Sequence, residues 1–368
     1  MIVANKSEKG GHIQGCLTLE SSTPMENSSD ITWSVIERLL SSDAIAHPQG
    51  SIWIPQPEFC KHSQNVLRSL SEHQLDVWHT FRPAVLAFER ANLITRPIKA
   101  AGPYDFAICV PTRQRIESLA LIAHAWLNLK PQGRLLFACS NDQGARGYLS
   151  YLKEVFPELE AESKSKCRYA LLMPNHIVHP EILQQWVQAA SAQVIPQTEL
   201  LGSAGIFGWN KVDRGSELLV ETLPALQGVG ADIGSGYGFL SHAVLSRSPG
   251  VSAIHLVEAE SRALECARLN LEGFQEKCHF HWQDVTKESI PLQLDWVVMN
   301  PPFHEGQTTN SQLGQFFIDV AARALRPGGV LYMVANKFLA YEDMLDRHFK
   351  SKTRLVEKDG FKVIHAQR

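Results

Sequence analysis

The side chains most suited to chemistry stand together in Asn300, Pro301, Pro302 and Phe303, directly after an apolar run. Proline lacks a backbone N–H and its φ is fixed, so the two prolines end the strand that this run predicts. The Asn300 side chain and the Pro301 carbonyl offer two acceptors on a stiff backbone. Such a pair can bind both hydrogens of an aromatic NH2 group and aim its lone pair, while the Phe303 ring stacks on the same plane. We therefore predict Asn300, Pro301 and Phe303 as catalytic residues.

Two neighbours of this motif are predicted to lie against the substrate. Pro302 belongs to the same stiff segment, and His304 follows it. His304 can contact the substrate or cap the loop, and both roles stay open. A plainer interpretation of the stretch is a turn that ends a strand and buries Phe303, but a glycine-rich loop upstream in the same half favours a functional site.

The segment "ADIGSGYG" places Asp232, Gly234, Gly236 and Gly238 between an apolar run and a helical pattern. Glycine permits sharp turns and close approach of a ligand, and the following helix has free N–H groups at its start. A dinucleotide-binding loop would carry its third glycine where Phe239 stands, and a P-loop would carry a lysine after the loop. Asp232 at the strand end suits a cationic or amino-bearing ligand better than a phosphate. The segment therefore predicts another kind of cofactor pocket.

Two further acids follow the next two apolar runs: Glu258 in "HLVEAE" and Asp284 in "HFHWQDV". An ionised carboxylate only accepts hydrogen bonds, so it suits a pair of hydroxyls or an exocyclic amine. Glu260 competes with Glu258, which is favoured because it directly follows the apolar run. Asp284 alone is equally suited to capping a helix. The order of the loop and both acids on consecutive strands favours one shared pocket.

The elements that must position these residues alternate between apolar runs and helical patterns. In the second half, "GVGADIG", "AIHLVEAE", "LDWVVMN" and "GGVLYMVAN" alternate with "FLSHAVLSR", "SRALECARLNLEG" and "QLGQFFIDVAARAL". This alternation predicts a doubly wound α/β sheet, which binds its ligands at the carboxyl ends of its strands.

The first half repeats part of this pattern. "DFAICVPTRQ" parallels "DWVVMNPPFH", and "AWLNLKPQGRLLFACSN" parallels "AARALRPGGVLYMVAN" in the same order. The match indicates tandem duplication, although helix–turn–strand segments of α/β proteins also resemble one another by chance. The first half has Val110 where Asn300 stands and Thr112 where Pro302 stands, and it has no glycine-rich loop. We predict two Rossmann-like domains, the first degenerate, that meet near residues 191–205.

The domain boundaries predicted are a flexible tail at 1–30, a degenerate domain at 31–195 and a catalytic domain at 196–368. The chain has 368 residues, 44% of them hydrophobic and 20% charged, which is typical of globular proteins. It has no run of the roughly 20 apolar residues that a membrane helix needs, and its first 30 residues contain no signal-peptide core.

The formal net charge of −3 argues against nucleic-acid binding by bulk electrostatics, so an RNA substrate needs a local basic patch. The segment after Asn336 is rich in lysine and arginine and is either such a patch or a solvated helix face. The seven cysteines form no C-x-x-C pair, which predicts reduced thiols and a cytoplasmic protein. The fifteen histidines show no ligand spacing, so no metal site is predicted.

The D-x-G-x-G-x-G pattern resembles motif I of class I S-adenosylmethionine-dependent methyltransferases. The resemblance implies S-adenosylmethionine as cofactor, with Asp232 and the glycines against its methionine part. It also implies that Glu258 binds the ribose hydroxyls and that Asp284 faces the adenine amine. N-P-P-[FY] resembles motif IV of the members that modify planar amines and amides.

The stretches "GIFGWNKVDRGSELLVETLP", "NPPFHEGQ" and "VANKFLAYEDML" are similar to the small-subunit rRNA guanine-N2 methyltransferase C family. That family has two tandem methyltransferase-like domains, of which only the second binds cofactor. The resemblance implies methyl transfer to N2 of guanine 1207 in 16S rRNA, and it places Phe207 near the cofactor. We expect the protein to be a monomer that acts on free 16S rRNA or on the assembled small subunit. Where the family often has cysteine, this chain has Ser235.

Three other functions remain open from the sequence. A sister family of the same architecture acts on a guanine of 23S rRNA, although "HEGQTT" and "FLAYEDML" favour the small-subunit type. A glutamine methyltransferase acting on a release factor fits the acidic charge. A non-catalytic assembly factor would keep the fold alone, but the intact motifs in the second half argue against it.

Overall fold

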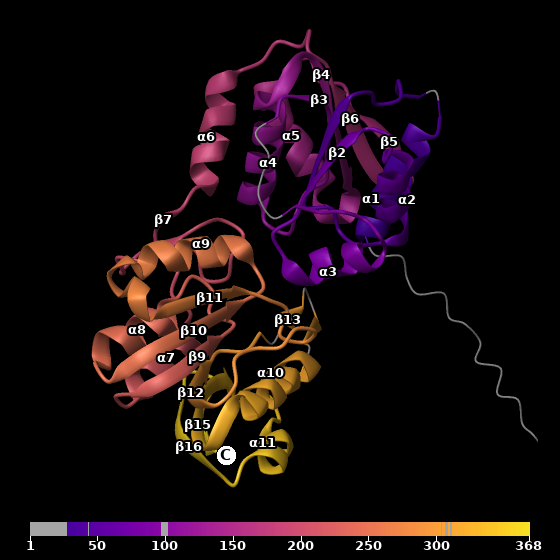
Figure 1. Ribbon diagram of the computed structural model, residues 1–368. Coiled ribbons are helices and arrows are strands. Elements are labelled where there is room, and N and C mark those ends of the chain that lie inside the picture. Colours follow the sequence, from indigo (N-terminus) through magenta and orange to yellow (C-terminus); the bar gives the residue numbers. More distant parts are fainter. Residues whose placement is uncertain (1–27, 43, 97–101, 303, 306–307, 310) are drawn as a thin grey trace, which may run out of the picture.

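The structure is a computed structural model that describes residues 28–42, 44–96, 102–302, 304–305, 308–309 and 311–368. Two mixed α/β domains follow one another along the chain (Figure 1). In the part described, no helix is both long enough and apolar enough to cross a bilayer. The fold confirms the prediction of two Rossmann-like units.

The first domain is built on a six-stranded sheet in the order β2-β1-β3-β4-β6-β5, counted over the described residues. Its strands are β1 (Ser51–Pro55), β2 (Gln74–Trp78), β3 (Tyr104–Cys109), β4 (Leu129–Ser140), β5 (Glu162–Lys164) and β6 (Cys167–Leu172). Its helices are α1 (Ser28–Leu40), α2 (Lys61–Ser69), α3 (Arg82–Arg90), α4 (Arg115–Leu127), α5 (Ala145–Val155) and α6 (Pro180–Ala190), with a 3-10 turn at Asn141–Gln143.

Side-chain alternation along β3 explains why helices cover both faces of this sheet. Phe106 and Ile108 join the core formed with α1, α2 and α3, whereas Ala107 and Cys109 join the core formed with α4, α5 and α6. A strand buried on both faces must be apolar throughout, as this one is. α1 begins at Ser28, so the helix includes three residues of the segment predicted as a tail, and residues 1–27 lie outside the described residues.

The second domain has a seven-stranded sheet in the order β11-β10-β9-β12-β15-β17-β16 within the described chain. Its strands are β9 (Gly228–Ile233), β10 (Val251–Glu258), β11 (Cys278–Trp282), β12 (Leu294–Met299), β15 (Leu325–Asn336), β16 (Ser351–Lys358) and β17 (Phe361–Gln367). Its helices are α7 (Arg214–Thr222), α8 (Phe239–Arg247), α9 (Ser261–Asn270), α10 (Ser311–Ala324) and α11 (Glu342–His348), with a 3-10 segment at Glu272–Lys277. Two short hairpins complete the described part of the chain: β7 (Gln193–Val194) with β8 (Leu201–Gly202), and β13 (His304–Glu305) with β14 (Thr308–Thr309).

The arrangement of helices and strands in this domain determines which edge of the sheet can hold a functional site. Helices α7, α8 and α9 pack on one face of the sheet and α10 and α11 on the other. Strands β9, β10, β11, β12 and β15 are mutually parallel, so their carboxyl ends meet at one edge. Among the described strands of this sheet, β17 alone runs antiparallel to its neighbours β15 and β16, so β16 has the same direction as β15. Half of the basic residues of the segment predicted as a helix face lie in β16 and β17, and Arg347 lies in α11. The helix interpretation was wrong because the apolar residues of 361–367 belong to a sheet strand.

The two sheets share one strand order once the edge strand β11 is set aside. Asp105 and Asp295, matched by sequence, lie in equivalent places. Asp105 Oδ2 accepts from the backbone N–H of Ser51 at 2.7 Å, and Asp295 Oδ2 accepts from that of Val229 at 2.7 Å. Each aspartate also pairs at 2.6 Å with the basic residue of its Leu-basic-Pro-x-Gly turn, which is Lys130 or Arg326. These contacts support the duplication.

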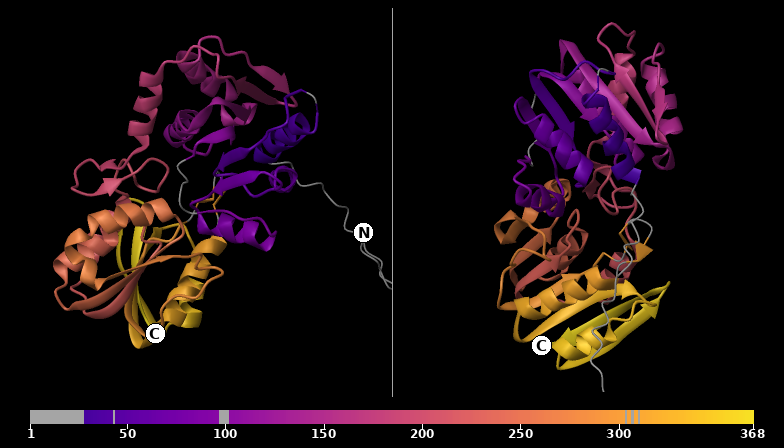
Figure 2. Two further views of the ribbon diagram at one scale, coloured as in Figure 1. Left: turned by 45° about the horizontal axis from the view of Figure 1, so that its top comes forward. Right: turned by 90° about the vertical axis from the view of Figure 1, so that its right-hand side faces the viewer.

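The domains are joined in sequence by α6 and the β7–β8 hairpin, and they also meet through α3 (Figure 2). The backbone N–H of Arg82 donates to the Ala259 carbonyl at 2.8 Å, and that of Ser261 donates to the Thr80 carbonyl at 3.0 Å. Phe81 and Glu260 form an antiparallel bridge between these bonds. The first domain therefore binds the segment that directly follows β10.

Candidate active site

The glycine-rich loop after β9 bends over the end of β10. Gly234, Gly236 and Gly238 have φ values of +77°, +54° and +85°, which side chains other than glycine rarely adopt. The N–H groups of Gly234 and Ser235 both donate to the Val257 carbonyl, at 2.8 and 3.2 Å. A Cβ on Gly236 would meet nothing within 4 Å, so the loop leaves open space at this point.

Glu258, at the end of β10, is held against that loop. Its Oε2 accepts from the Gly236 N–H at 2.8 Å, and its Oε1 accepts from the N–H groups of Ala259 and Glu260 at 2.8 and 2.9 Å. Burial raises the pKa of Glu258, and the backbone donors oppose that shift. The competing acid Glu260 instead binds Arg262, so the structure brings Glu258 rather than Glu260 to the loop.

Asp232 lies beneath the loop and is fully buried. Its Oδ2 accepts from the backbone N–H and the hydroxyl of Ser241 on α8, at 3.1 and 2.7 Å. Its Oδ1 and the Ser235 Oγ are buried without a hydrogen-bond partner among the described residues. Burial raises the pKa of Asp232 to about 7. Unpaired buried polar atoms beside open space fit a pocket that a polar ligand completes.

Asp284 and Phe207 flank the same loop region. Asp284 follows β11, whose residue Trp282 is in register with Glu258 on β10. Asp284 Oδ1 accepts from the N–H and hydroxyl of Thr286 at 2.9 and 2.7 Å, which fixes the carboxylate in a turn. Phe207 is 64% exposed, and a Cβ on the adjacent Gly208 would lie 3.1 Å from the Tyr237 ring of the glycine-rich loop. Both predicted residues therefore lie at the edge that carries Glu258.

Asn300 directly follows β12, which pairs with β9 so that Val298 is in register with Asp232. Its amide nitrogen donates to Asp213 Oδ2 at 2.8 Å and to Ser216 Oγ at 2.9 Å. Among the described residues, none donates a hydrogen bond to its amide oxygen.

The rest of the motif is only partly described. Pro301 is buried and Pro302 is exposed. Phe303 lies outside the described residues. The backbone of His304 pairs with Thr309 in the β13–β14 hairpin, and its side chain lies outside the described atoms. The roles predicted for Phe303 and His304 therefore stay predictions.

Asp213 and Ser216 are the residues that the sequence analysis missed. Asp213 caps α7, because its Oδ2 accepts from the Ser216 N–H at 2.9 Å. The segment "VDRGSE" carries the signature of such a cap. The contact with Asn300 spans 87 positions in sequence, so no local pattern shows it.

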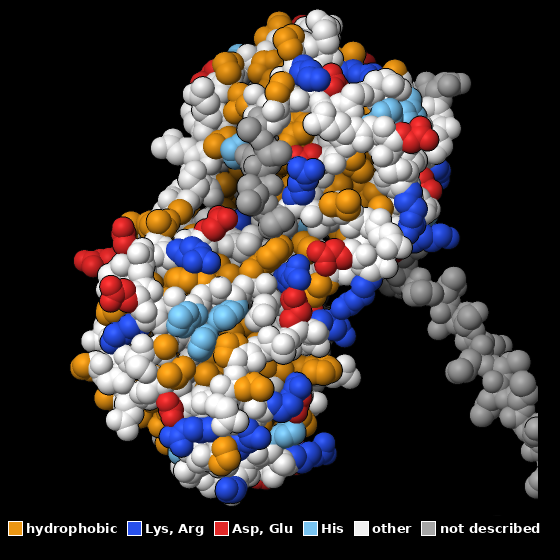
Figure 3. Space-filling model, viewed as in Figure 1, with side chains coloured by type: hydrophobic (Ala, Val, Ile, Leu, Met, Phe, Trp, Pro, Cys, Tyr) orange, Lys and Arg blue, Asp and Glu red, His pale blue; other side chains and the backbone are white. Residues whose placement is uncertain are grey.

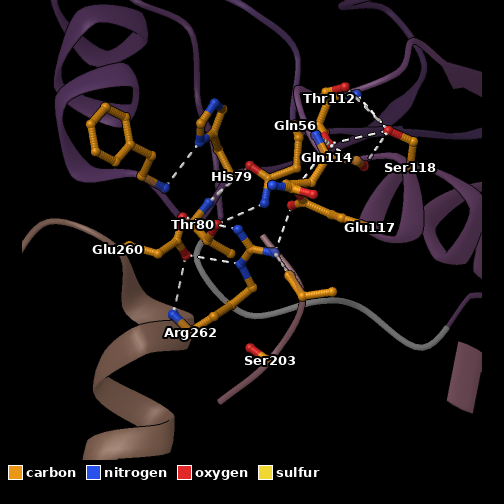
Figure 4. Close-up of polar contacts among 12 residues, drawn as sticks. Gln56, His79, Thr80, Thr112, Gln114, Glu117, Ser118, Ser203, Glu260 and Arg262 are labelled. Atoms are coloured by element: carbon orange, nitrogen blue, oxygen red, sulfur yellow. Dashed lines mark hydrogen bonds and ion pairs between the residues drawn. The ribbon is translucent and has the colours of Figure 1, made fainter. Parts of the chain in front are cut away.

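Polar groups of the first domain also contact the segment that follows Glu258 (Figure 4). Arg262 pairs with Glu260 at 2.9 Å and with Glu117 of α4 at 2.6 Å. Burial raises the pKa of Glu117, and burial lowers the pKa of His79 to about 4. This network fixes the loop after Glu258 to the first domain.

Some of the positive charges of the C-terminal segment are paired with acids within the fold. Lys362 is buried and pairs with Glu342 at 2.7 Å, and Lys352 pairs with Asp346. Figure 3 shows basic and acidic side chains interspersed over one face of the molecule. Among the described residues, no cluster of three or more histidine, cysteine or acidic side chains could hold a metal ion. The six cysteines of the described chain form no disulfide.

The chain is similar to known methyltransferases. A model described as the methyltransferase small domain matches residues 197–365. The chain is 26% identical to the ribosomal RNA small subunit methyltransferase C of Shewanella piezotolerans, over 90% of this chain and 89% of the relative. It is 28% identical to the protein of that name from Shewanella pealeana, over 79% of each.

The solved structure of a T. thermophilus 16S rRNA N2 G1207 methyltransferase, in complex with S-adenosylmethionine and guanosine, is similar over most of the chain. The two share 25% identity with a TM-score of 0.72, covering 91% of this chain and 92% of the other. Both domains are therefore shared with that enzyme.

Proposed function

Because this chain belongs to the ribosomal RNA small subunit methyltransferase C family, we propose that it transfers a methyl group from S-adenosylmethionine to the exocyclic N2 of a guanine in 16S rRNA. The T. thermophilus relative is named for guanine 1207, and we assign the same nucleotide here. The structural observation that carries the proposal is the Asn300 amide, whose nitrogen is bound within the protein at the carboxyl edge of β12. Its oxygen is thereby left to accept from a substrate amine.

The residues around the glycine-rich loop fit the cofactor. The unpaired Asp232 Oδ1 and Ser235 Oγ and the open space at Gly236 are suited to the polar methionine part. Gly234 and Gly238 shape the same turn. We assign Glu258 to the ribose hydroxyls, because its carboxylate is fixed at the loop.

Asp284 and Phe207 complete the assigned cofactor set. Asp284 would accept from the adenine amine through the oxygen that Thr286 does not bind. The exposed Phe207 ring would pack on the cofactor from the side of Gly208. S-adenosylmethionine supplies a methyl group on a good leaving group, so the protein needs no nucleophile.

Catalysis by the chain then consists of orienting the amine. The N2 lone pair of guanine is delocalised into the ring, which makes it a poor nucleophile. We assign the Asn300 Oδ1 and the Pro301 carbonyl as acceptors for the two N2 hydrogens, which draws the nitrogen toward tetrahedral geometry. Acceptors fixed in advance favour the transition state because no reorganisation is needed during transfer. The released proton passes to water.

The remaining motif residues hold the base. We assign Phe303 to stacking on guanine, and Pro302 and His304 to contacts with the nucleotide. The guanine must leave its stack to reach this edge, which costs a few kcal/mol. The first domain lacks the glycine-rich loop and the Asn-Pro-Pro motif, so we assign it a structural and RNA-binding role. We further propose that the chain acts as a monomer in the cytoplasm on free 16S rRNA or the assembled small subunit.

The test is a methyl-acceptor panel with mass mapping. Purified protein and tritiated S-adenosylmethionine are incubated with 16S rRNA, assembled small subunits, 23S rRNA and a release factor, all from a strain that lacks the gene. We expect label in 16S rRNA alone, as one N2-methylguanine at position 1207. Label in 23S rRNA or in the release factor would contradict the proposal.

A further inference from the structure

We propose that Asp213 and Ser216 are positioning residues that fix the Asn300 amide with its oxygen toward the substrate amine. The inference deepens the proposed function and rests on it. Neither residue touches the reacting atoms; both act through Asn300.

The contacts account for both hydrogens of the Asn300 amide. Its nitrogen lies 2.8 Å from Asp213 Oδ2 and 2.9 Å from Ser216 Oγ. A carboxylate can only accept, so the group that faces Asp213 must be the NH2 and not the oxygen. If the amide were flipped, its oxygen would lie against a negatively charged oxygen and the hydrogen bond to Asp213 would be lost, whereas the Ser216 hydroxyl could donate to the flipped oxygen. Asp213 therefore selects one of the two amide orientations, and Ser216 binds the amide in that orientation.

The N-terminus of α7 sets the positions of both groups. Asp213 Oδ2 accepts from the Ser216 N–H at 2.9 Å, so one helix cap places the carboxylate and the hydroxyl on the same side. Both residues have little freedom to move. Ser216 is 8% exposed, and a Cβ on Gly215 between them would lie 3.0 Å from Asp213 Oδ2 and 3.0 Å from the Phe361 ring. Asn300 is thus oriented by a different element from the strand that carries it.

The carboxylate also changes the chemistry of the amide oxygen. An amide whose N–H groups donate to a charged acceptor becomes more polarised, which increases the negative charge on its oxygen. That oxygen then binds more strongly to an amine that gains positive charge during methyl transfer. A neutral partner at position 213 would keep the orientation only in part and would lose this polarisation.

The test is a set of variants measured in single-turnover methyl transfer, on whichever form of 16S rRNA the wild type methylates. Asp213→Ser keeps a helix cap but cannot reach Asn300, whereas Asp213→Asn keeps the reach and removes the charge. Removing one such orienting group should lower the transfer rate about 10- to 100-fold for Asp213→Ser, with a smaller loss for Asp213→Asn. The affinity for S-adenosylmethionine, measured by calorimetry, should stay within about twofold. The matched control is Glu217→Gln, which removes the same charge from the first turn of α7 and contacts Arg214 instead.

A double variant separates positioning from general stability. If Asp213 acts through Asn300, then Asp213→Ser combined with Asn300→Ala is no slower than Asn300→Ala alone. The inference is overturned if the rate losses of Asp213→Ser and Asn300→Ala multiply in the double variant. It is also overturned if the loss in Asp213→Ser is matched by a lower melting temperature or by weaker cofactor binding. Asp213 would then have a purely structural role. An active wild type with an equally fast Asp213→Ser variant would also overturn it. A wild type that methylates no form of 16S rRNA would overturn the proposed function itself.

Discussion

At the scale of single residues, the site depends on polar groups fixed before any ligand binds. Glu258 is held by three backbone N–H groups, and Asn300 is held by a carboxylate and a hydroxyl. Rigid placement means that little ordering is needed when the cofactor and the base arrive. Each of these groups should therefore affect one step of the reaction and leave the other unchanged.

The Glu258→Gln variant tests the cofactor side. A hydrogen bond to a charged group contributes about 1.5 to 3 kcal/mol, so losing the charge should raise the Kd for S-adenosylmethionine about 10- to 100-fold. Titration calorimetry measures this, with the exposed Glu265→Gln of α9 as a control of equal charge change. Unchanged affinity in Glu258→Gln would remove Glu258 from the cofactor site.

The sequence placed the strand-end residues correctly on one edge of the sheet because local patterns mark where strands end. It predicted Glu258 over Glu260 by the same reasoning, and the structure brings Glu258 to the loop. It missed Asp213 and Ser216, whose contact with Asn300 depends on how α7 packs on the face of the sheet. Such a contact is a property of the tertiary fold and leaves no local signal.

At the scale of elements, the same contact between a glycine and an aspartate occurs at the start of β1 in the first domain and of β9 in the second. Gly50 and Gly228 have φ values of +76° and +78°, and an added Cβ would lie 2.2 or 2.1 Å from the Oδ2 of Asp105 or Asp295. That carboxylate binds the N–H of the next residue and the basic residue of the turn. The repeated contact explains why an aspartate stands near the start of β3 and of β12.

Alanine at either glycine should lower the melting temperature of the protein. The strained φ costs about 1 kcal/mol or more, and displacing the carboxylate should bring the total to about 2 to 4 kcal/mol. The control is Gly144→Ala, where φ is +85° but a Cβ meets nothing within 4 Å, so only the strain applies. Equal losses in all three variants would show that the aspartate contact contributes nothing.

The sequence predicted some elements of the second domain and missed others. The parallel strands and helices from β9 to β15 were predicted because apolar runs buried on both faces alternate with helical patterns. The antiparallel pair β16 and β17 was missed. β16 is mostly exposed, so its many charged residues resemble a solvated surface in sequence.

At the scale of the whole molecule, the first domain contacts the ends of β10 and β11, to which we assign the cofactor residues Glu258 and Asp284. Besides the bonds of residues 80–82 to the segment after Glu258, Arg82 pairs at 2.7 Å with Glu288, which itself accepts from the Asp284 N–H at 2.9 Å. The domain that lacks the chemical residues therefore helps to hold the loops of the domain that has them.

Acid should weaken this interface through His79. Burial lowers its pKa to about 4 from 6.5, so the unfolded chain binds more protons between these values. The contribution of His79 to the free energy of unfolding therefore falls as pH decreases from about 6.5 toward 4, by about 2 kcal/mol at pH 5. Denaturation at pH 7.5 and pH 5 should show a smaller pH dependence for His79→Gln than for the wild type. The same dependence in both would exclude His79.

The central claim is that Asn300 acts on the amine and not on the cofactor. The most direct test is single-turnover methyl transfer by Asn300→Ala, measured together with the affinity for S-adenosylmethionine. We predict a rate about 100- to 1,000-fold below the wild type, because one preorganised acceptor of the transition state is lost. The Kd should stay within about twofold of the wild type. An unchanged transfer rate, or a slower rate explained entirely by lost cofactor binding, would contradict the account.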